Sequence, residues 1–182
     1  MYYLAVVLPY HLNQQVLVMK QEFHDKYGCK VGLKSPAHIT LIPPFKMVPQ
    51  KENTLLETVQ QFAQDQGTFS LTTDGFSAFK PRTIFIAVQH SDALDALKQN
   101  LEQVLTASRE YGIKKENRPF HPHVTLATRD LEKSDFFEAW QHFKDMPHQE
   151  SWEVQGISIL RHNGRSWDVL YTAPLNRDSI TA

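Results

Sequence analysis

Hydrophobic and polar residues alternate with two different periods along the chain. In some segments apolar residues recur every three or four positions, which places them on one face of a helix. Between these segments lie short apolar runs rich in β-branched residues, which favour strands. The pattern therefore predicts a protein of alternating strands and helices. The first helical series is Leu12, Val16, Met19, Phe23 and Tyr27, and Gly28 is its expected stop.

The expected elements follow one another in a regular order. Strands are predicted at residues 2–8, 37–41, 69–79, 83–88, 123–127, 152–160 and 167–172. The later helical series lie within 55–62, 94–105 and 136–143. Ser91 and Ser134 are the expected N-caps of the last two. Pro43 and Pro44 are expected to end the second strand, and Asn163-Gly164 predicts a hairpin turn before the last one.

The second half of the chain repeats the order of elements in the first. Four pairs of landmarks have nearly the same offset, which indicates duplication of one unit. We expect a pseudo-twofold α+β protein with lobes at about 1–82 and 83–165, completed by a final strand at 166–173, and a shared site between the lobes. The pairs are Leu12 with Leu94, Leu55 with Phe136, Gly75 with Gly156, and Arg82 with Arg165, at offsets of 82, 81, 81 and 83 residues.

Composition and charge limit the classes of function. The 41% hydrophobic and 21% charged residues are ordinary for a globular protein and exclude wholesale disorder. The 19 Lys and Arg against 20 Asp and Glu give a formal charge of −1, which argues against tight binding to long nucleic acid. A small anion in a locally basic cleft is compatible with this balance.

The sequence also carries expectations about compartment and partners. Cys29 is the single cysteine, which excludes an intrachain disulfide and fits a reducing compartment. The first basic residue is Lys20, and the apolar run at 2–9 is too short to span a bilayer, so we expect neither a secretory signal nor a membrane anchor. The expected protein is cytoplasmic and monomeric, with no stable protein partner.

One tetrapeptide pattern occurs twice, in step with the repeat. His38-Ile39-Thr40-Leu41 and His123-Val124-Thr125-Leu126 are offset by 85 residues. Because successive side chains of a strand point to opposite faces, each His and its Thr share one face, with about 7 Å between their Cα atoms. The apolar residues between them point the other way, into a core. Two such strands facing each other place two imidazoles and two hydroxyls around one position.

The paired motifs resemble those of the 2H phosphoesterase superfamily, whose best-known members are the bacterial 2′-5′ RNA ligase-like proteins. The resemblance covers both His-x-Thr motifs, the order of elements and the strand led by Pro81-Arg82. It implies two lobes whose antiparallel sheets line a central cleft, with helices outside. It further implies an enzyme that hydrolyses 2′,3′-cyclic phosphates, on an RNA end or a small nucleotide, without a metal or other cofactor.

The resemblance implies a catalytic role for each motif residue. His38 is expected to donate a proton to the leaving oxygen, and His123 to accept one from the attacking water. Thr40 and Thr125 are expected to donate hydrogen bonds to the non-bridging phosphate oxygens. The same residues would join a cyclic end to a hydroxyl if the hydroxyl takes the place of the water, so hydrolysis and 2′-5′ ligation both stay open.

Other residues are candidates for binding the substrate, and other functions are open. A nucleotide-binding or RNA-end-binding module without turnover is one alternative. The other is a metal-dependent hydrolase, because the spacing of His121 and His123 suits a metal pair to which His38 could add a third ligand. The candidate substrate-binding residues are Arg82, Arg129 and Arg165 for phosphate, Phe45 and Phe120 for stacking on a base, and His121 at the rim.

Overall fold

The computed structural model describes residues 1–177, and the predicted alternation of strands and helices is confirmed. Among the described residues, no helix is long and apolar enough to span a membrane. The strands are β1 (Tyr2–Val7), β2 (His38–Phe45), β3 (Phe69–Phe79), β4 (Thr83–Val88), β5 (His123–Ala127), β6 (Ser151–Val154), β7 (Gly156–His162) and β8 (Trp167–Pro174). The α-helices are α1 (Tyr10–Tyr27), α2 (Glu52–Gln64), α3 (Asp92–Ala107) and α4 (Lys133–Phe143), and 3₁₀ turns are η1 (Gly32–Lys34), η2 (Pro49–Lys51) and η3 (Arg109–Tyr111).

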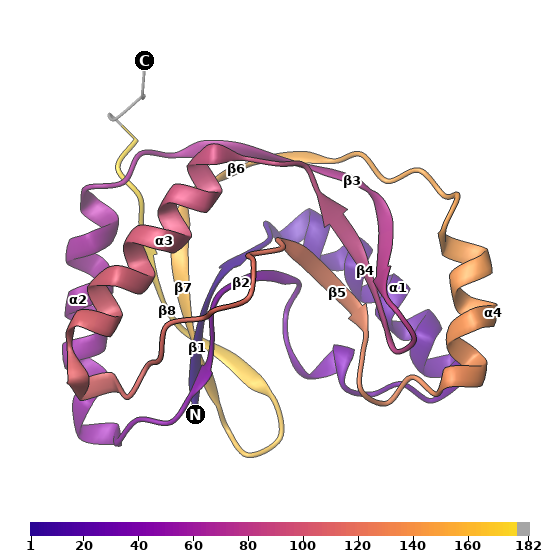
Figure 1. The fold of residues 1–182 in the computed structure, drawn as a ribbon, viewed down its shortest axis with the longest axis horizontal. Coiled ribbons are helices and arrows are strands. Elements are labelled where there is room, and N and C mark those ends of the chain that lie inside the picture. The colour runs from indigo at the N-terminus through magenta and orange to yellow at the C-terminus, as the bar shows by residue number, and fades with distance from the viewer. Residues whose placement is uncertain (178–182) are drawn as a thin grey trace.

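All eight strands join one antiparallel sheet in the order β6-β3-β4-β5-β2-β1-β7-β8. The two motif strands, β2 and β5, meet at its centre, with the other strands fanning out on either side (Figure 1). Each half of the sheet takes strands from both halves of the sequence, since β1 pairs with β7, and β3 pairs with β6. The boundary after residue 82 therefore follows the sequence repeat and does not divide the sheet. The predicted α+β class is confirmed, with one continuous sheet in place of separate ones.

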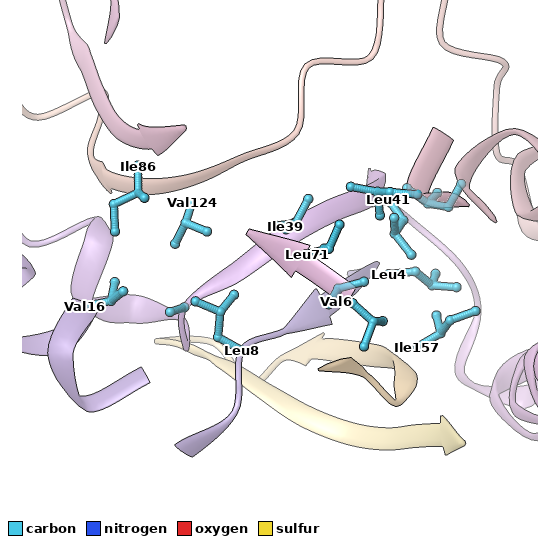
Figure 2. Packing of buried hydrophobic residues seen from close by; sticks show 14 of the residues in the cluster. Leu4, Val6, Leu8, Val16, Ile39, Leu41, Leu71, Ile86, Val124 and Ile157 are labelled. Atoms are coloured by element: carbon cyan, nitrogen blue, oxygen red, sulfur yellow. The ribbon is translucent and has the colours of Figure 1, made fainter. Parts of the chain in front are cut away.

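The helices cover one face of the sheet, in two pairs. Helices α2 and α3 lie beside the β7–β8 side, whereas α1 and α4 lie beside the β4–β5 side (Figure 1). The buried apolar residues of all four α-helices belong to one large core, which also takes Leu4 and Val6 of β1. Figure 2 shows residues of this core, among them Ile39 of β2 and Val124 of β5. The alternate residues of β1, Tyr3 and Ala5, belong to a second, smaller cluster on the opposite face.

Strand β2 runs through the two prolines that were expected to end it. Pro43 and Pro44 are exposed, and the pairing of β2 with β1 shifts register between the pairs Leu4–Ile42 and Tyr2–Phe45. An irregularity of this kind lets a strand pass residues that lack a backbone donor. The strand resumes at Phe45, which is 8% exposed and packs in the core against Tyr2.

The predicted strand at 152–160 is two strands at different places in the sheet. Trp152 lies in β6, which pairs with β3, whereas Leu160 lies in β7, which pairs with β1 and β8. The chain crosses from one half of the sheet to the other at Gln155 and Gly156. A Cβ on Gly156 would lie 2.8 Å from the Ala173 carbonyl oxygen of β8, so glycine is what allows this close approach.

Replacing Gly156 with alanine is expected to lower the free energy of unfolding by about 1–3 kcal/mol, because the new methyl group forces β7 and β8 apart. Urea denaturation measures the loss. The matched control is Gln155→Ala at the neighbouring exposed position, where we expect a change within about 0.5 kcal/mol. Equal stability of Gly156→Ala and wild type would contradict the tight approach of the two strands.

Two smaller features differ from the sequence prediction. The N-cap of α4 is Glu132, so Ser134 lies inside the first turn, whereas Ser91 caps α3 as predicted by accepting a hydrogen bond from the Leu94 amide at 3.3 Å. Val104, assigned to the buried face of α3, is 40% exposed. The buried face of that helix follows the leucines Leu94, Leu97, Leu101 and Leu105.

Candidate active site

The two motifs face each other across the central strand pair. Ile39 and Val124 are the paired residues of β2 and β5, and both are fully buried in the core. In an antiparallel pair this register sets His38 opposite Thr125 and Thr40 opposite His123. All four are partly exposed, on the face away from the helices. The arrangement is a rectangle in which the imidazoles occupy one diagonal and the hydroxyls the other.

Each imidazole is held by the carbonyl oxygen two residues before it. The Nδ1 atom of His38 lies 2.7 Å from the Pro36 oxygen, and that of His123 lies 2.6 Å from the His121 oxygen. A carbonyl can only accept, so Nδ1 carries the donated proton in both rings. The other nitrogen, Nε2, is then the one that gains or loses a proton in each histidine. The two halves of the repeat therefore prepare their histidines in the same way.

Both imidazoles are neutral in the free protein near neutral pH. Burial lowers the pKa of His38 to about 4, against the opposing effect of its hydrogen bond to the Pro36 carbonyl, and the positive charge of Lys20 acts in the same direction as burial. Burial also lowers the pKa of His123, and the hydrogen bond to the His121 carbonyl only partly opposes this. A phosphodiester anion between them has the opposite effect, because a nearby negative charge favours the imidazolium. We therefore expect the site to take up a proton as it binds an anion.

An aromatic ring supports each imidazole from the neighbouring strand. The ring of Tyr3 on β1 lies 4.9 Å from that of His38, between centroids, and the ring of Phe85 on β4 lies 4.7 Å from that of His123. Tyr3 also packs edge-on against Trp167 at 4.6 Å. These aromatic residues were not among the predicted site residues. Tyr3 and Phe85 are 82 residues apart, so the repeat offset was the signal that could have found them.

Two cavities adjoin at the rectangle, and Thr40 lines both. The first cavity, of about 490 Å³, is lined by His38 and Thr125 together with Tyr3 and Trp167. The second, of about 370 Å³, is lined by His123 with Phe79, Phe120 and His121. The catalytic candidates therefore lie where two pockets meet, and each pocket brings aromatic surface to one side of the site.

The predicted binding residues divide into three groups. Arg129 lines the first cavity, and Phe120 and His121 line the second. Arg82 and Arg165 are exposed at the tips of the β3–β4 and β7–β8 hairpins and line neither cavity. Phe45, expected to stack on a base, packs in the core instead, because the shifted pairing of β2 turns its ring toward Tyr2.

The alternative interpretation as a metal-dependent hydrolase requires His38, His121 and His123 to form a metal site. Among residues 1–177, no three His, Cys, Asp or Glu side chains come together as a set that could hold a metal ion. His121 instead places its ring edge-on against Phe79, at 5.2 Å between centroids. This contact makes it part of the aromatic wall beside His123.

Known proteins resemble this chain in sequence and in fold. Residues 9–166 match the 2′-5′ RNA ligase superfamily. A protein of Bacillus pumilus that is named as a phosphoesterase is 27% identical over 148 residues, which cover 79% of this chain and 81% of that protein. An RNA 2′,3′-cyclic phosphodiesterase of Geobacillus stearothermophilus is 33% identical over 101 residues, but these cover 50% of this chain and only 30% of that protein. The crystal structure of E. coli LigT complexed with 3′-AMP shares the fold with a TM-score of 0.69 at 20% identity, over 97% of this chain and 98% of that one.

The central strand pair of the sheet carries both His-x-Thr pairs. The match extends over most of the sequence, from residue 9 to residue 166. The chain belongs to the 2′-5′ RNA ligase superfamily.

Proposed function

We propose that this protein hydrolyses 2′,3′-cyclic phosphates, on a small nucleotide or an RNA end, by acid–base catalysis with two histidines and without a metal. The observation that carries the proposal is the rectangle of His38, Thr40, His123 and Thr125 at the junction of two cavities. The names of the Bacillus and Geobacillus relatives support the reaction class, and the 3′-AMP complex of LigT supports a nucleotide ligand. The single buried Cys29 suits a cytoplasmic protein.

The mechanism needs one proton removed and one supplied. Hydrolysis requires a water and a leaving sugar oxygen roughly in line through phosphorus. Imidazoles on the diagonal of the rectangle can serve opposite sides of a phosphorus at its centre. In our proposal, Nε2 of His123 takes the proton of the water, and Nε2 of His38 gives one to the leaving oxygen. Because His38 is neutral in the free protein, it gains its proton as the phosphodiester anion binds.

The threonines complete the site. Thr40 and Thr125 lie on the other diagonal, where their hydroxyls can donate to the two non-bridging oxygens. Two imidazoles and two hydroxyls thus supply both proton transfers and the charge stabilisation. Joining of the cyclic end to a hydroxyl uses the same groups, because the hydroxyl takes the place of the attacking water and the 3′ oxygen again leaves with a proton. The proposal therefore includes 2′-5′ ligation at high concentrations of both ends.

The test is a turnover assay on adenosine 2′,3′-cyclic phosphate and on a short RNA ending in a 2′,3′-cyclic phosphate, with EDTA present. We expect hydrolysis by the wild type and none by the His38→Ala, His123→Ala double variant. Turnover that is lost with EDTA and restored by zinc would overturn the metal-free mechanism. Ligand-dependent thermal stabilisation without any turnover would favour a binding module.

The pH dependence of kcat/KM follows from the two histidines of the free protein. The reaction needs one of the two histidines protonated and the other neutral. The plot of kcat/KM against pH is therefore bell-shaped, and activity falls below a pKa of about 4 and above the lowered pKa of His123. Both values lie below 6.5, so we expect a maximum below pH 6.5 and a roughly tenfold fall per pH unit on the alkaline limb. A kcat/KM that is constant or rises from pH 6 to 8 would contradict this assignment. Steady-state kinetics in constant-ionic-strength buffers provide the measurement.

A further inference from the structure

The first cavity carries positive charge that the reaction itself does not require. Lys34 of η1 and Arg129 after β5 line it, together with His162, and no Asp or Glu is among its lining residues. Within residues 1–177, the side chains of Lys34 and Arg129 have neither a hydrogen bond nor an ion pair. Two cations without partners at one rim of a pocket form a place for an anion.

A buried cation lies behind the same wall. Lys20 of α1 is 4% exposed, and its ammonium donates a hydrogen bond to the Ser35 carbonyl oxygen at 3.0 Å. Among the described residues it has no carboxylate partner, which is rare for a buried charge. Ser35 and Lys34 both line the first cavity, so the charge of Lys20 lies directly beneath the turn that carries Lys34. Its positive charge adds to the potential at this end of the site.

The second cavity differs in charge. Its two basic side chains are already paired, because Lys98 contacts Glu102 at 2.9 Å and Arg118 contacts Glu116 at 2.8 Å. Its other walls include the rings of Phe79 and Phe120. Aromatic faces without free cations suit a nucleobase. The two cavities that flank the catalytic rectangle are therefore suited to different parts of a nucleotide.

The chemistry of ribose connects these two preferences. In a 2′,3′-cyclic nucleotide the base is on C1′, next to C2′, and the 5′ group is attached through C4′, next to C3′. With the cyclic phosphate at the rectangle, the base and the 5′ group extend in opposite directions. A base in the second cavity directs the 5′ group toward the first.

We propose that the first cavity holds a second phosphate, the 5′-phosphate of the nucleotide that bears the cyclic phosphate, bound by Lys34 and Arg129 and supported by Lys20. This inference rests on the proposed function for the position of the reacting phosphate. It defines the preferred substrate as one with a phosphodiester or phosphate on its 5′ side, hence an oligonucleotide end or a 5′-phosphorylated nucleotide over a simple cyclic mononucleotide.

The experiment compares two substrates that differ by one phosphate. Adenosine 2′,3′-cyclic phosphate and its 5′-phosphorylated form are hydrolysed by wild type, Lys34→Gln and Lys30→Gln, and the ratio of the two kcat/KM values is measured for each protein. Lys30 is an exposed lysine four residues away that lines neither cavity, so it controls for general charge. We expect the 5′-phosphate to raise kcat/KM of the wild type about tenfold, the value of one charge-assisted contact. In Lys34→Gln the two substrates are expected to have nearly the same kcat/KM. In Lys30→Gln the preference for the 5′-phosphorylated substrate is expected to equal that of the wild type. Added salt reduces the wild-type ratio.

Binding separates this proposal from the proposed function. Thermal shifts are recorded with adenosine 2′-monophosphate and adenosine 2′,5′-bisphosphate, neither of which needs turnover. A larger stabilisation by the bisphosphate that requires Lys34 supports the second-phosphate site even if no cyclic phosphate is hydrolysed. Suppose that both cyclic substrates are hydrolysed with equal kcat/KM and that the monophosphate and the bisphosphate give equal thermal shifts. This result would overturn the second-phosphate site and leave the proposed function intact. If Lys30→Gln loses the preference for the 5′-phosphorylated substrate as much as Lys34→Gln does, the second-phosphate site is also overturned, and the preference is an effect of the general surface charge.

Discussion

Replacing either histidine with alanine is expected to lower kcat/KM for adenosine 2′,3′-cyclic phosphate by about 10²–10⁴-fold, with the fold intact. Each variant removes one of the two proton transfers, and neither side chain is needed by the core, because His38 and His123 are partly exposed on the groove face. The kcat/KM of the double variant is expected to be little lower than that of the less active single variant, since the two residues act as a unit. Steady-state kinetics and thermal denaturation of the same preparations measure both parts.

The matched control is His142→Ala, an exposed histidine on α4, where wild-type kinetics are expected. A substrate with a nitrophenolate leaving group distinguishes the two roles, because this group departs without a proton. Such an ester is expected to restore much of the rate of His38→Ala but not of His123→Ala. Restoration of His123→Ala alone would exchange the acid and the base. Full activity of both single variants would contradict the paired-histidine mechanism.

Much of the site could be predicted because its residues follow local rules. A His and a Thr two residues apart in a strand share a face whatever surrounds them, and the buried Ile39 and Val124 fix which face that is. The repeat then indicated that the two strands carry equivalent roles. What it could not show is that β2 and β5 are paired at Ile39 and Val124, since this register joins residues 85 apart. That pairing turns two motifs into one rectangle.

The sequence predictions were wrong where the structure depends on pairing between strands that are distant in sequence. The run at 152–160 is a plausible single strand by composition, yet its two parts pair with β3 and with β1, far away in sequence. Gly156 served only as a landmark of the repeat, and the pattern does not say that the chain crosses to the other half of the sheet there. The same holds for Phe45 and Phe120. Both flank a motif, but the shifted pairing of β2 places Phe45 in the core, whereas Phe120 lines the second cavity.

Replacing Thr40 or Thr125 with valine is expected to lower kcat by about 10²–10³-fold, equivalent to roughly 3 kcal/mol of transition-state stabilisation. Valine keeps the shape and the strand preference of threonine and removes only the hydroxyl. Within the described part of the chain neither hydroxyl has a hydrogen-bond partner, so both are available to the phosphate oxygens. Because negative charge on these oxygens increases in the transition state, kcat is expected to fall much more than KM rises.

The control for the threonines is Thr72→Val on β3, whose hydroxyl already bonds with Ser151 at 2.8 Å near the far edge of the sheet. Its kinetics are expected to equal those of the wild type. The pseudo-twofold relation makes a further demand, since each threonine faces the histidine of the other motif across β2 and β5. Losses of similar size at both positions fit two donors on one phosphate. A large loss at Thr40 with none at Thr125 would instead mean that a single hydroxyl stabilises the transition state, and that the sequence repeat is not matched by a repeat of function.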